Sequence, residues 1–515
     1  MEKKNLLCGV AFNYHDSSVS FALDDQVLLV LEAERVFRLK KKGCNSKEME
    51  RLILYGLNLL NKDADDVSYW ALETLLNPWL DEKDRYPNPP VWRDINILGK
   101  KRKSLVINHH LSHAAAFLFT QMDTATIFNC DGGGDFGERV TVYTGNGTTL
   151  TKENFNVSDF ITAKPYDLCA TYLYNYPRCE GKLMALAAYG TPKGEYISRL
   201  EGLLPILCTT TYEVGDEVLT KAFPGLKGKA SSLNVDACDF SASVQEVFVR
   251  HRMRDIGKVT ETFRNQNLVL SGGACLNLEV NTEVWKTLNY SQIFIPPCCD
   301  DTGQSLGAIS YLITELFGTR PNMELPFVGI GRAHFSFSQK NIDELVDNLL
   351  DNQIIIVHNS KAEIGPRALG NRSFIARPDS MEVKEILNHQ IKAREDYRPL
   401  APMVLEEKVH EYFIGPNKSP FMLDQYEVRR NVRALIEGVI HRNNTARAQT
   451  VTRKHNPFMY DLIKRFGERT GIYVLVNTSL NLKGEPISNT IEQTMSISSK
   501  IKQSHKVVYN GVVVK

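Results

Sequence analysis

The chain opens with short apolar runs separated by polar turns, a pattern typical of a β-meander. Leu6 to Phe12 is apolar, Val19 to Leu23 alternates between apolar and polar positions, and Val27 to Leu31 is apolar again. His15-Asp16-Ser17-Ser18 and Asp24-Asp25 lie between these runs. Because turn-forming residues bound each run, we predict three consecutive strands joined by tight turns.

A second unit of the same design begins about a hundred residues later. Thr126 to Cys130 predicts a strand, Asp131 to Asp135 a glycine-rich turn, and Arg139 to Tyr143 a returning strand. Asn146-Gly147 then predicts a hairpin. The two units suggest an internal duplication whose turns face one cleft. Hairpins with such turns are common, so the pattern by itself leaves two unrelated hairpins equally open.

The middle of the chain alternates predicted helices and strands. Helical periodicity covers residues 47–60 and 241–262. Asn267 to Gly273 predicts a buried strand that enters a glycine turn and then a helix. Ile293 to Gly307 predicts a strand followed by a helix.

Residues 320–335 contain proline and glycine without periodicity, which is typical of a domain boundary. We therefore predict a first domain over residues 1–335 and a second over residues 336–515. The second domain is a separate α+β or α/β unit. Its predicted helices are Asn341–Leu350, Met381–Gln390 and Phe458–Arg469, and its predicted strands are Ile354–His358, Tyr473–Val476 and a closing strand or hairpin over residues 507–514.

Composition narrows the class of protein. The 515 residues include 43% hydrophobic and 23% charged residues, a globular balance that excludes a disordered chain. The 61 Lys and Arg against 60 Asp and Glu leave a formal charge of +1, so we expect neither nucleic acid nor a membrane as a partner. The ten cysteines form no CxxC pair, and no secretory or membrane-spanning segment is evident. We expect a soluble, reduced, cytoplasmic protein.

The segment NHHLSHAAAFLF carries the strongest metal signal. His109 and His113 are four residues apart, so on a helix both imidazoles project from one face, while His110 points elsewhere. Asp131 in the glycine turn and Asp301 in the DDTG turn supply oxygen ligands. Such a set suits Fe, Mn, Zn or Co, and spacing alone does not choose the metal. A core helix with buried histidines is the alternative.

Two glycine turns are moderate nucleotide signals. Gly132 and Gly133 expose backbone N–H groups that a phosphate can approach closely. Gly272 and Gly273, with Asn277, offer the same at a junction between a strand and a helix. Neither turn matches a Walker motif, and a plain tight turn is as well supported for each.

Seven motifs occur in one order along nearly the whole chain. They are GKLMALAAYG, LSGGACLN, PPCCDDTGQSLGA, EIGPRALGNRS, REDYRPLAP, TARAQTV and NTSLNLKGEPI. Together they closely resemble the NodU/CmcH family of O-carbamoyltransferases. The resemblance implies an N-terminal actin/Hsp70-like (ASKHA) duplicated domain and a C-terminal YrdC-like α/β domain.

The resemblance also implies roles for individual residues. In the first domain, His109, His113, Asp131 and Asp301 would hold iron or another divalent transition metal. His15, Lys40 and Asp239 match catalytic residues, and Gly132, Gly133, Lys182, Gly272, Gly273 and Asn277 match a nucleotide site. In the second domain, carbamoyl phosphate and ATP with Mg²⁺ would bind Arg372, Lys392, Arg394, Met422, Arg447, Asn477, Ser479 and Asn481. Asp135 departs from the family pattern, and its role stays open.

The charges of the second domain suit this chemistry. Joining two polyanions requires cations that offset phosphate repulsion, and guanidinium groups bind phosphate with two hydrogen bonds. The candidate cations are Arg367, Arg372, Lys392, Arg394 and Arg447. The alternative is a set of surface cations paired with Glu363, Glu395 and Asp396.

We therefore expect an ATP-dependent O-carbamoyltransferase. The second domain would form carbamoyl adenylate, and the first would transfer the carbamoyl group to a hydroxyl of a small-molecule alcohol such as a natural product, antibiotic, toxin or sugar. Two alternatives stay open, namely carbamoyl or threonylcarbamoyl transfer to a macromolecule, and a non-catalytic actin-like nucleotide switch. A homodimer also stays open.

Overall fold

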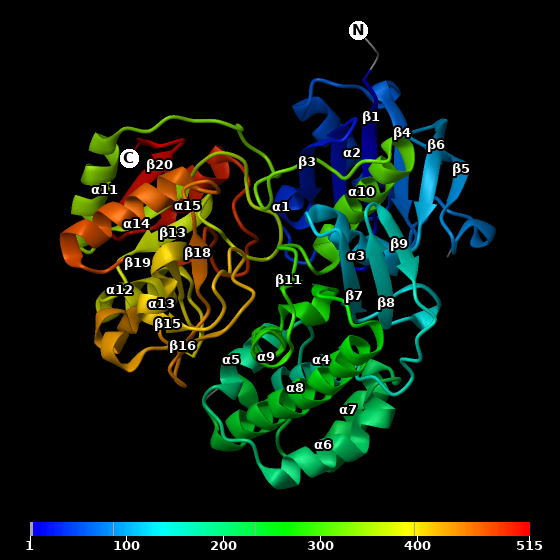
Figure 1. Cartoon of the computed structure of the whole chain (residues 1–515). Helices are drawn as coiled ribbons and strands as arrows, with labels where there is room; N and C mark the ends of the chain where they lie inside the picture. The colour runs from blue at the N-terminus through cyan, green and yellow to red at the C-terminus, as the bar shows by residue number, and fades with distance from the viewer. Residues whose placement is uncertain (1–3, 86, 232, 396, 515) are drawn as a thin grey trace.

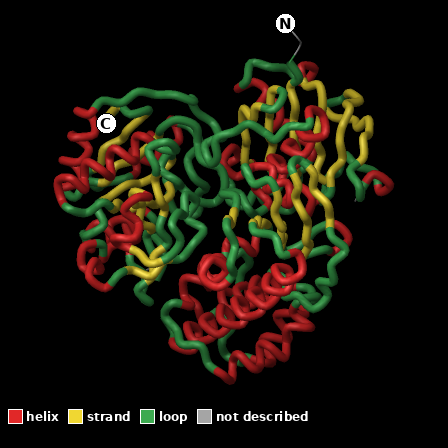
Figure 2. Tube along the Cα trace, in the orientation of Figure 1, coloured by secondary structure: helices red, strands yellow, loops and turns green. Residues whose placement is uncertain are grey.

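The computed structural model describes residues 4–85, 87–231, 233–395 and 397–514. Figure 1 shows three masses: a strand-rich region that holds the N-terminus, a helical region around α4 to α8 below it, and a second domain beside both that holds the C-terminus. Figure 2 shows that loops fill much of the space where the second domain meets the strand-rich region. In the described part of the chain, no helix is long and apolar enough to cross a membrane.

The first sheet has six strands in the order β3-β2-β1-β4-β6-β5. β1 is antiparallel to β2 and parallel to β4, and β4 is parallel to β6. The predicted opening meander is confirmed as β1, β2 and β3. The bounds are β1 (Leu6–Ala11), β2 (Ser18–Leu23), β3 (Gln26–Glu32), β4 (Val67–Glu73), β5 (Val91–Ile97) and β6 (Lys100–Ile107).

The second sheet repeats this arrangement in the order β11-β10-β7-β8-β9. β7 is antiparallel to β8 and parallel to β10, as β1 is to β2 and β4. The duplication is therefore confirmed, and the first domain is a mixed α/β fold of the actin/Hsp70-like kind. The bounds are β7 (Thr124–Cys130), β8 (Val140–Asn146), β9 (Thr149–Lys152), β10 (Asn267–Ser271) and β11 (Gln292–Phe294).

Alternating side chains of β1 divide between two cores. Leu6, Cys8 and Val10 face a core that includes α2 (Ser46–Leu59). Leu7 faces a core shared with β7, α3 (His109–Ala114) and α10 (Gln304–Phe317). A Cβ at Gly9 would lie 2.5 Å from the Ser305 carbonyl oxygen, so glycine lets α10 pack closely on β1. The two sheets thus enclose the helix α3 that carries both candidate histidine ligands.

A helical region follows β9 and covers the other face of the second sheet. Its apolar core includes Phe128 of β7 and side chains of the long helix α8. The bounds are α4 (Lys164–Tyr174), α5 (Glu180–Ala187), α6 (Gly194–Leu207), α7 (Tyr212–Ala222), α8 (Val235–Phe263) and α9 (Leu278–Thr287).

The second domain contains a seven-stranded sheet in the order β18-β14-β19-β13-β12-β20-β21 and a three-stranded sheet β15-β16-β17. The seven strands are β12 (Ile354–His358), β13 (Arg372–Ala376), β14 (Ala401–Leu405), β18 (Gln449–Val451), β19 (Val474–Ser479), β20 (His505–Tyr509) and β21 (Val512–Val513). The three are β15 (Phe413–Ile414), β16 (Tyr426–Val428) and β17 (Thr445–Ala446). The boundary near residue 335 and the YrdC likeness stay predictions.

The second domain contains the three predicted helical segments and two helices that were not predicted, α13 and α15. The helices are α11 (Gln339–Leu350), α12 (Met381–Glu385), α13 (Val409–Tyr412), α14 (Pro457–Thr470) and α15 (Ile491–Lys500). The predicted helix over residues 381–390 divides into α12 and a π-helical segment, Ile386–Ile391. Such wide turns often occur at functional sites, and this one ends directly before Lys392.

Candidate functional site

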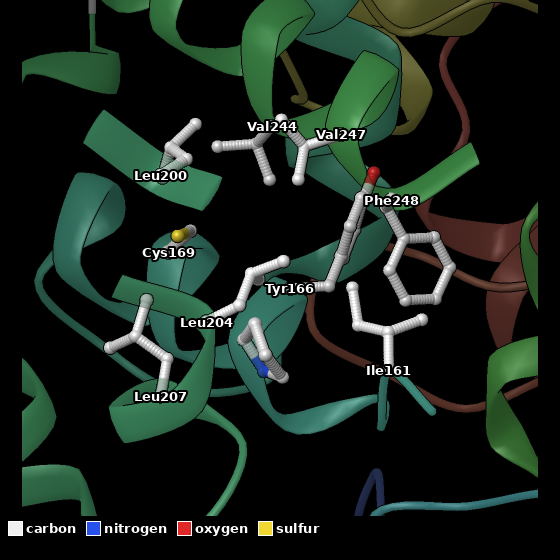
Figure 3. A pocket seen from close by; sticks show the side chains of 10 residues that line it. Ile161, Tyr166, Cys169, Leu200, Leu204, Leu207, Val244, Val247 and Phe248 are labelled. Atoms are coloured by element: carbon white, nitrogen blue, oxygen red, sulfur yellow. The ribbon is translucent and has the colours of Figure 1, made fainter. Parts of the chain in front are cut away.

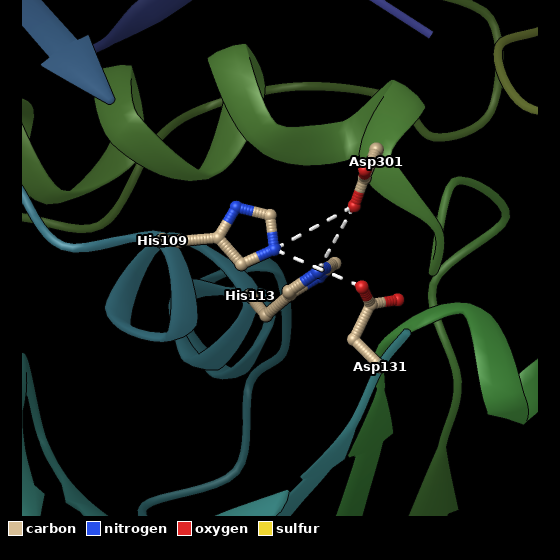
Figure 4. A group of neighbouring side chains, drawn as sticks. All are labelled: His109, His113, Asp131 and Asp301. Atoms are coloured by element: carbon tan, nitrogen blue, oxygen red, sulfur yellow. Dashed lines mark ion pairs between the residues drawn. The ribbon is translucent and has the colours of Figure 1, made fainter. Parts of the chain in front are cut away.

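Four side chains from three separate segments converge between the two sheets. His109 and His113 lie one turn apart on α3, Asp131 follows β7, and Asp301 begins the turn before α10 (Figure 4). Asp301 Oδ1 lies 3.4 Å from His113 Nε2 and 3.7 Å from His109 Nε2. One ligand atom from each of the four residues lies within 4.8 Å of the others. The structure therefore brings together the four predicted metal ligands.

The donor atoms of this cluster fit a metal ion. His113 Nε2 and Asp301 Oδ1 are buried and, in the described structure, have no hydrogen-bond partner. Gly273 N donates to Asp131 Oδ1 at 2.7 Å, which leaves the other oxygen facing His109. Burial opposes ionisation of Asp131, but the neighbouring His109 and His113 rings and the Gly273 N–H hold its pKa well below the usual range. Two nitrogen and two oxygen donors suit a divalent transition metal, whose identity stays a prediction.

His110 lies outside the cluster, as the spacing predicted. Its Nδ1 lies 2.9 Å from Thr141 Oγ1, and its Nε2 lies 3.1 Å from the Glu138 carbonyl oxygen. Burial and the charges of His109 and His113 lower the pKa of His110 to about 3, so this ring stays neutral. Its role is to brace α3 against β8.

His15 stands beside the cluster and is held by its neighbour. His15 Nδ1 lies 2.9 Å from Asp16 Oδ2 and 3.8 Å from Asp301 Oδ2. Lys41 Nζ donates to the same Asp16 oxygen at 2.8 Å. Lys41 therefore completes the polar group around His15, and the predicted role of Lys40 near the carbamoyl group stays a prediction.

Lys40 faces the second domain. Burial, together with the charges of Arg398 and Lys182, lowers its pKa. Lys182, which the resemblance implies for a nucleotide site in the first domain, forms an ion pair with Glu395 of the second domain. The structure thus brings both lysines toward the cations of the second domain.

Asp239 lies on α8, where it fastens a loop. Its Oδ1 accepts a hydrogen bond of 2.7 Å from Thr191 N, and its Oδ2 lies 3.1 Å from Lys193 Nζ. The loop it holds follows the GKLMALAAYG motif. Its predicted place beside an acceptor hydroxyl stays a prediction.

The glycine turns differ in what their backbones contact. Gly272 has φ +93°, and a Cβ there would lie 2.2 Å from the Cys130 carbonyl oxygen, so the ends of β7 and β10 meet at this residue. Gly132 and Gly133 have open space around the corresponding position. Asn277 caps α9 and exchanges hydrogen bonds with Gln245. Gly132 and Gly133 thus leave a ligand more room than Gly272.

Lys392 is a buried cation of the predicted carbamoyl phosphate site. Its side chain donates to Ser479 and to Asn481 Oδ1, the latter at 2.6 Å. Asn477 donates to Gln449 Oε1 at 2.8 Å and to the Ala368 carbonyl oxygen at 3.0 Å. Burial, then the charges of Arg394 and Lys40, hold the pKa of Lys392 well below its usual range. The strand β19 therefore positions Lys392 through its polar side chains.

Several cations gather near Lys392 without carboxylate partners. Among the described residues, Arg367, Lys392, Arg394 and Arg447 form no ion pair with Asp or Glu. Burial, and then the charge of Arg398, lower the pKa of Arg394 to about 9. Burial and the charges of Arg367 and Arg394 hold the pKa of Arg447 well below its usual range. Half-buried cations that repel one another are typical of an anion-binding site. We call Arg367, Lys392, Arg394, Arg398 and Arg447 the cationic group.

Arg372 does not share the environment of that group. It is fully buried and donates to the carbonyl oxygens of Asn359, Asn371, Ile330 and Ser360. Glu363, considered above as a partner for surface cations, accepts from the backbone of Leu369 and Arg372 instead. Asp396 lies outside the described residues. Arg372 binds backbone carbonyl oxygens on both sides of the predicted domain boundary, and its predicted contact with carbamoyl phosphate stays a prediction.

Both ends of the chain match known families. The N-terminal carbamoyltransferase model matches residues 79–310, and the C-terminal carbamoyltransferase model matches residues 346–515. Nodulation protein NolNO of Sinorhizobium fredii is 30% identical over an alignment that covers 94% of this chain and 76% of that protein. The chain belongs to the carbamoyltransferase family.

Other relatives of this carbamoyltransferase are similarly distant. Nodulation protein NolO of Bradyrhizobium diazoefficiens is 31% identical, covering 76% of this chain and 75% of that protein. The 3'-hydroxymethylcephem-O-carbamoyltransferase of Amycolatopsis lactamdurans is 31% identical, covering 60% of each chain. Solved structures are more remote. One of them is the activator of the 2-hydroxyisocaproyl-CoA dehydratase from Clostridium difficile. Its alignment covers 60% of this chain and 95% of the activator chain. Its TM-score is 0.38 at 12% identity.

Two cavities of the carbamoyltransferase lie apart from the metal-ligand cluster. Apolar side chains of α4, α6 and α8 line a cavity of about 260 Å³ (Figure 3). Its one hydroxyl, that of Tyr166, already donates to Gln245 at 2.7 Å. A second cavity of about 380 Å³ lies near Met422 and is lined by Leu369, Phe421 and Gln449 among others. Neither contains a charge suited to phosphate.

Four further residues belong to these sites, although no motif in the sequence indicated them. Asp16 and Lys41 hold His15, Glu73 contacts His109, and Arg398 adds to the cationic group. Asp16 is next to His15, and Arg398 lies four residues after Arg394. Closeness in sequence to a candidate residue could therefore have indicated these two. Glu73 ends a strand with no motif around it, and only the fold brings it to the cluster.

Proposed function

We propose that this carbamoyltransferase is an ATP-dependent O-carbamoyltransferase with two separate reaction sites. The observation that carries the proposal is the segregation of charge. Among the described residues, Arg367, Lys392, Arg394 and Arg447 of the second domain form no ion pair with a carboxylate, and Arg398 pairs with Glu395. In the same part of the chain, the converging His and Asp donors of the first domain form no ion pair with a lysine or arginine. The cationic group of the second domain suits polyanions. The His and Asp cluster of the first domain suits a metal ion beside a phosphate.

In the proposed first half-reaction, carbamoyl phosphate and ATP bind the cationic group. Carbamoyl phosphate loses its phosphoryl group to water and gives carbamate and phosphate. A carbamate oxygen then attacks the α-phosphorus of ATP, and the bond to the leaving pyrophosphate breaks. Arg394, Arg447 and Lys392 would offset the repulsion between the two anions. The hydrogen bonds from Lys392 to Ser479 and Asn481 hold its charge in place, while Mg²⁺ accompanies the ATP phosphates.

In the proposed second half-reaction, an acceptor hydroxyl attacks the carbamoyl carbon and AMP leaves. His15 would take the hydroxyl proton at Nε2, because Asp16 occupies Nδ1 and fixes the ring. The cluster of His109, His113, Asp131 and Asp301 would hold the metal, which when bound supplies a Lewis acid for the departing phosphate. Asp239 and Lys40 keep their predicted roles near the acceptor and the carbamoyl group as part of this proposal.

The acceptor we propose is a small-molecule alcohol. The cephem relative is named for O-carbamoylation of a hydroxymethyl group, and this chain is 31% identical to that protein over 60% of its length. We therefore propose a hydroxyl on a natural product, antibiotic, toxin or sugar as the substrate. A macromolecular acceptor would call for a wide charged surface, and the net charge of +1 offers no support for one that binds nucleic acid.

Two variants separate the half-reactions. With carbamoyl phosphate and ATP, Arg447→Ala should abolish pyrophosphate release, because it removes a charge from the cationic group. His113→Ala should retain pyrophosphate release and lose carbamoyl transfer to a panel of alcohols. Arg453→Ala is the matched control for Arg447, because Arg453 is exposed and pairs with Asp461 at the surface.

The outcomes distinguish the candidate functions. Loss of pyrophosphate release in both Arg447→Ala and His113→Ala would contradict two separate sites. Slow ATP hydrolysis by the wild-type protein, with no dependence on carbamoyl phosphate, would instead indicate a nucleotide switch.

A further inference from the structure

A buried carboxylate lies behind one of the candidate metal ligands. Glu73 is the last residue of β4, and both Glu73 and His109 are fully buried. Glu73 Oε1 lies 3.0 Å from His109 Nδ1. The same oxygen accepts a hydrogen bond of 2.7 Å from Leu75 N. His109 therefore contacts Glu73 through one ring nitrogen and faces Asp131 and Asp301 through the other.

A second buried carboxylate holds the backbone of the same ligand. Asp135 Oδ2 accepts from His109 N at 2.8 Å and from Thr74 Oγ1 at 2.7 Å. Asp135 is fully buried and ends the glycine turn that begins at Asp131. The turn, the end of β4 and the start of α3 are thus fastened together at this aspartate.

We propose that Glu73 is a positioning residue of the metal site, acting through His109. A carboxylate at Nδ1 requires the proton of the neutral imidazole to lie on that nitrogen. The lone pair of Nε2 then faces the other three ligands, as a metal ion needs. Asp135 fixes the backbone of the same residue. This inference rests on the proposed metal site of the O-carbamoyltransferase.

The charges around the cluster support this role. Within the described residues, no lysine or arginine forms an ion pair with Glu73, Asp131, Asp135 or Asp301. Glu73 Oε2 and Asp135 Oδ1 are buried without a hydrogen-bond partner in the same part of the chain. A buried carboxylate is costly unless a cation lies nearby, and a bound metal ion would supply that charge.

Two substitutions separate orientation from charge. In Glu73→Gln, the Leu75 N–H still requires an acceptor at this position, so the amide oxygen should stay toward His109 Nδ1 and keep its tautomer. The negative charge alone is lost. In Glu73→Leu, both the acceptor and the charge are lost. Glu363→Gln is the matched control, because Glu363 is also fully buried and accepts two backbone hydrogen bonds, but lies in the second domain.

The experiment measures metal binding by the full-length protein. Co²⁺ is titrated into metal-free protein in competition with a chelator, and its visible absorption reports the ligand set. We expect Glu73→Leu to weaken Co²⁺ binding roughly 10- to 100-fold, and Glu73→Gln to weaken it less and keep the wild-type band positions. Glu363→Gln should bind as the wild type does. Circular dichroism of the metal-free proteins checks that each variant is folded.

The possible outcomes are distinct. Wild-type affinity in folded Glu73→Leu would overturn the proposal, as would Glu73→Gln binding no better than Glu73→Leu. If Glu73→Leu does not fold, the test depends on Glu73→Gln. A Co²⁺ affinity and absorption spectrum of Glu73→Gln identical to those of Glu363→Gln would then overturn the proposal. Pyrophosphate release with carbamoyl phosphate and ATP should persist in every Glu73 variant. Its absence in the wild type would contradict the proposed function, whatever the metal result.

Discussion

Arg35 of the first domain donates a hydrogen bond of 2.6 Å to the carbonyl oxygen of Gly365 in the second. Its guanidinium also donates to the Glu363 carbonyl oxygen and pairs with Glu32. Glu32 in turn accepts from Gly365 N at 2.6 Å. Arg35 lies in α1 (Ala33–Phe37), between His15 and Lys41 in the sequence, and Gly365 lies two residues before Arg367 of the cationic group. This contact therefore joins the segments that carry the two proposed sites.

Arg35→Ala should weaken the junction between the domains. The side chain is 3% exposed, and its removal leaves the Glu32 carboxylate buried without its cation. Breaking such a pair costs about 3 kcal/mol. Urea denaturation should detect that loss. Arg199→Ala, which removes an exposed pair with Glu195, should change stability by less than about 1 kcal/mol, and an equal loss in both variants would contradict the role of Arg35.

Gly272→Ala should disrupt the metal-ligand cluster. The backbone at Gly272 has φ +93°, and a Cβ would lie 2.2 Å from the Cys130 carbonyl oxygen, next to Asp131. Strain of this kind costs about 1 to 3 kcal/mol, and the collision adds to it. We expect a lower melting temperature and weaker Co²⁺ binding. Gly133→Ala is the control, because a Cβ there meets no atom within 4 Å, and it should melt as the wild type does.

Asp239→Asn tests whether this residue acts in transfer or only fastens its loop. Asn keeps an oxygen for Thr191 N, whereas the charge facing Lys193 is lost. If the proposed role near the acceptor holds, carbamoyl transfer should fall at least tenfold while pyrophosphate release stays normal. Lys193→Met removes the ion pair alone. Equal losses of transfer in the two variants would indicate that the ion pair, rather than the carboxylate, matters.

His358 should make the stability of the second domain depend on pH. Its Nδ1 lies 2.7 Å from Thr494 Oγ1, and burial with the charge of Arg372 lowers its pKa to about 2. The unfolded chain binds a proton near pH 6.5, whereas the native ring stays neutral, so stability is lost as the pH falls below that value. The slope approaches about 1.4 kcal/mol per pH unit. Urea denaturation between pH 7 and pH 5 should show this slope, and His358→Gln should reduce it. An unchanged slope in the variant would exclude His358 as its cause.

The sequence predicted the metal-ligand residues because their geometry is mostly local. His109 and His113 share a face of α3 through helical spacing, and His110 is turned away by the same spacing. The paired meanders of β1 to β3 and β7 to β9 followed from turns rich in Asp, Gly and Asn. That Asp131 and Asp301 meet those histidines depends on β7 and α10 both packing against α3, which only the fold shows.

Short-range patterns predicted the strands of the two meanders, several of the helices, the position of the histidines and the carbamoyltransferase motifs, because each depends on neighbours within a few residues. Only the tertiary structure determines which charged side chains contact one another. Lys40 and Lys41 are adjacent, yet the left-handed backbone at Lys41 turns one side chain to Asp16 and leaves the other toward Arg398. Arg372 carries the same charge as Arg447 but binds four carbonyl oxygens. Side-chain direction and burial depend on the packing of distant segments, so no pattern along the chain encodes them by itself.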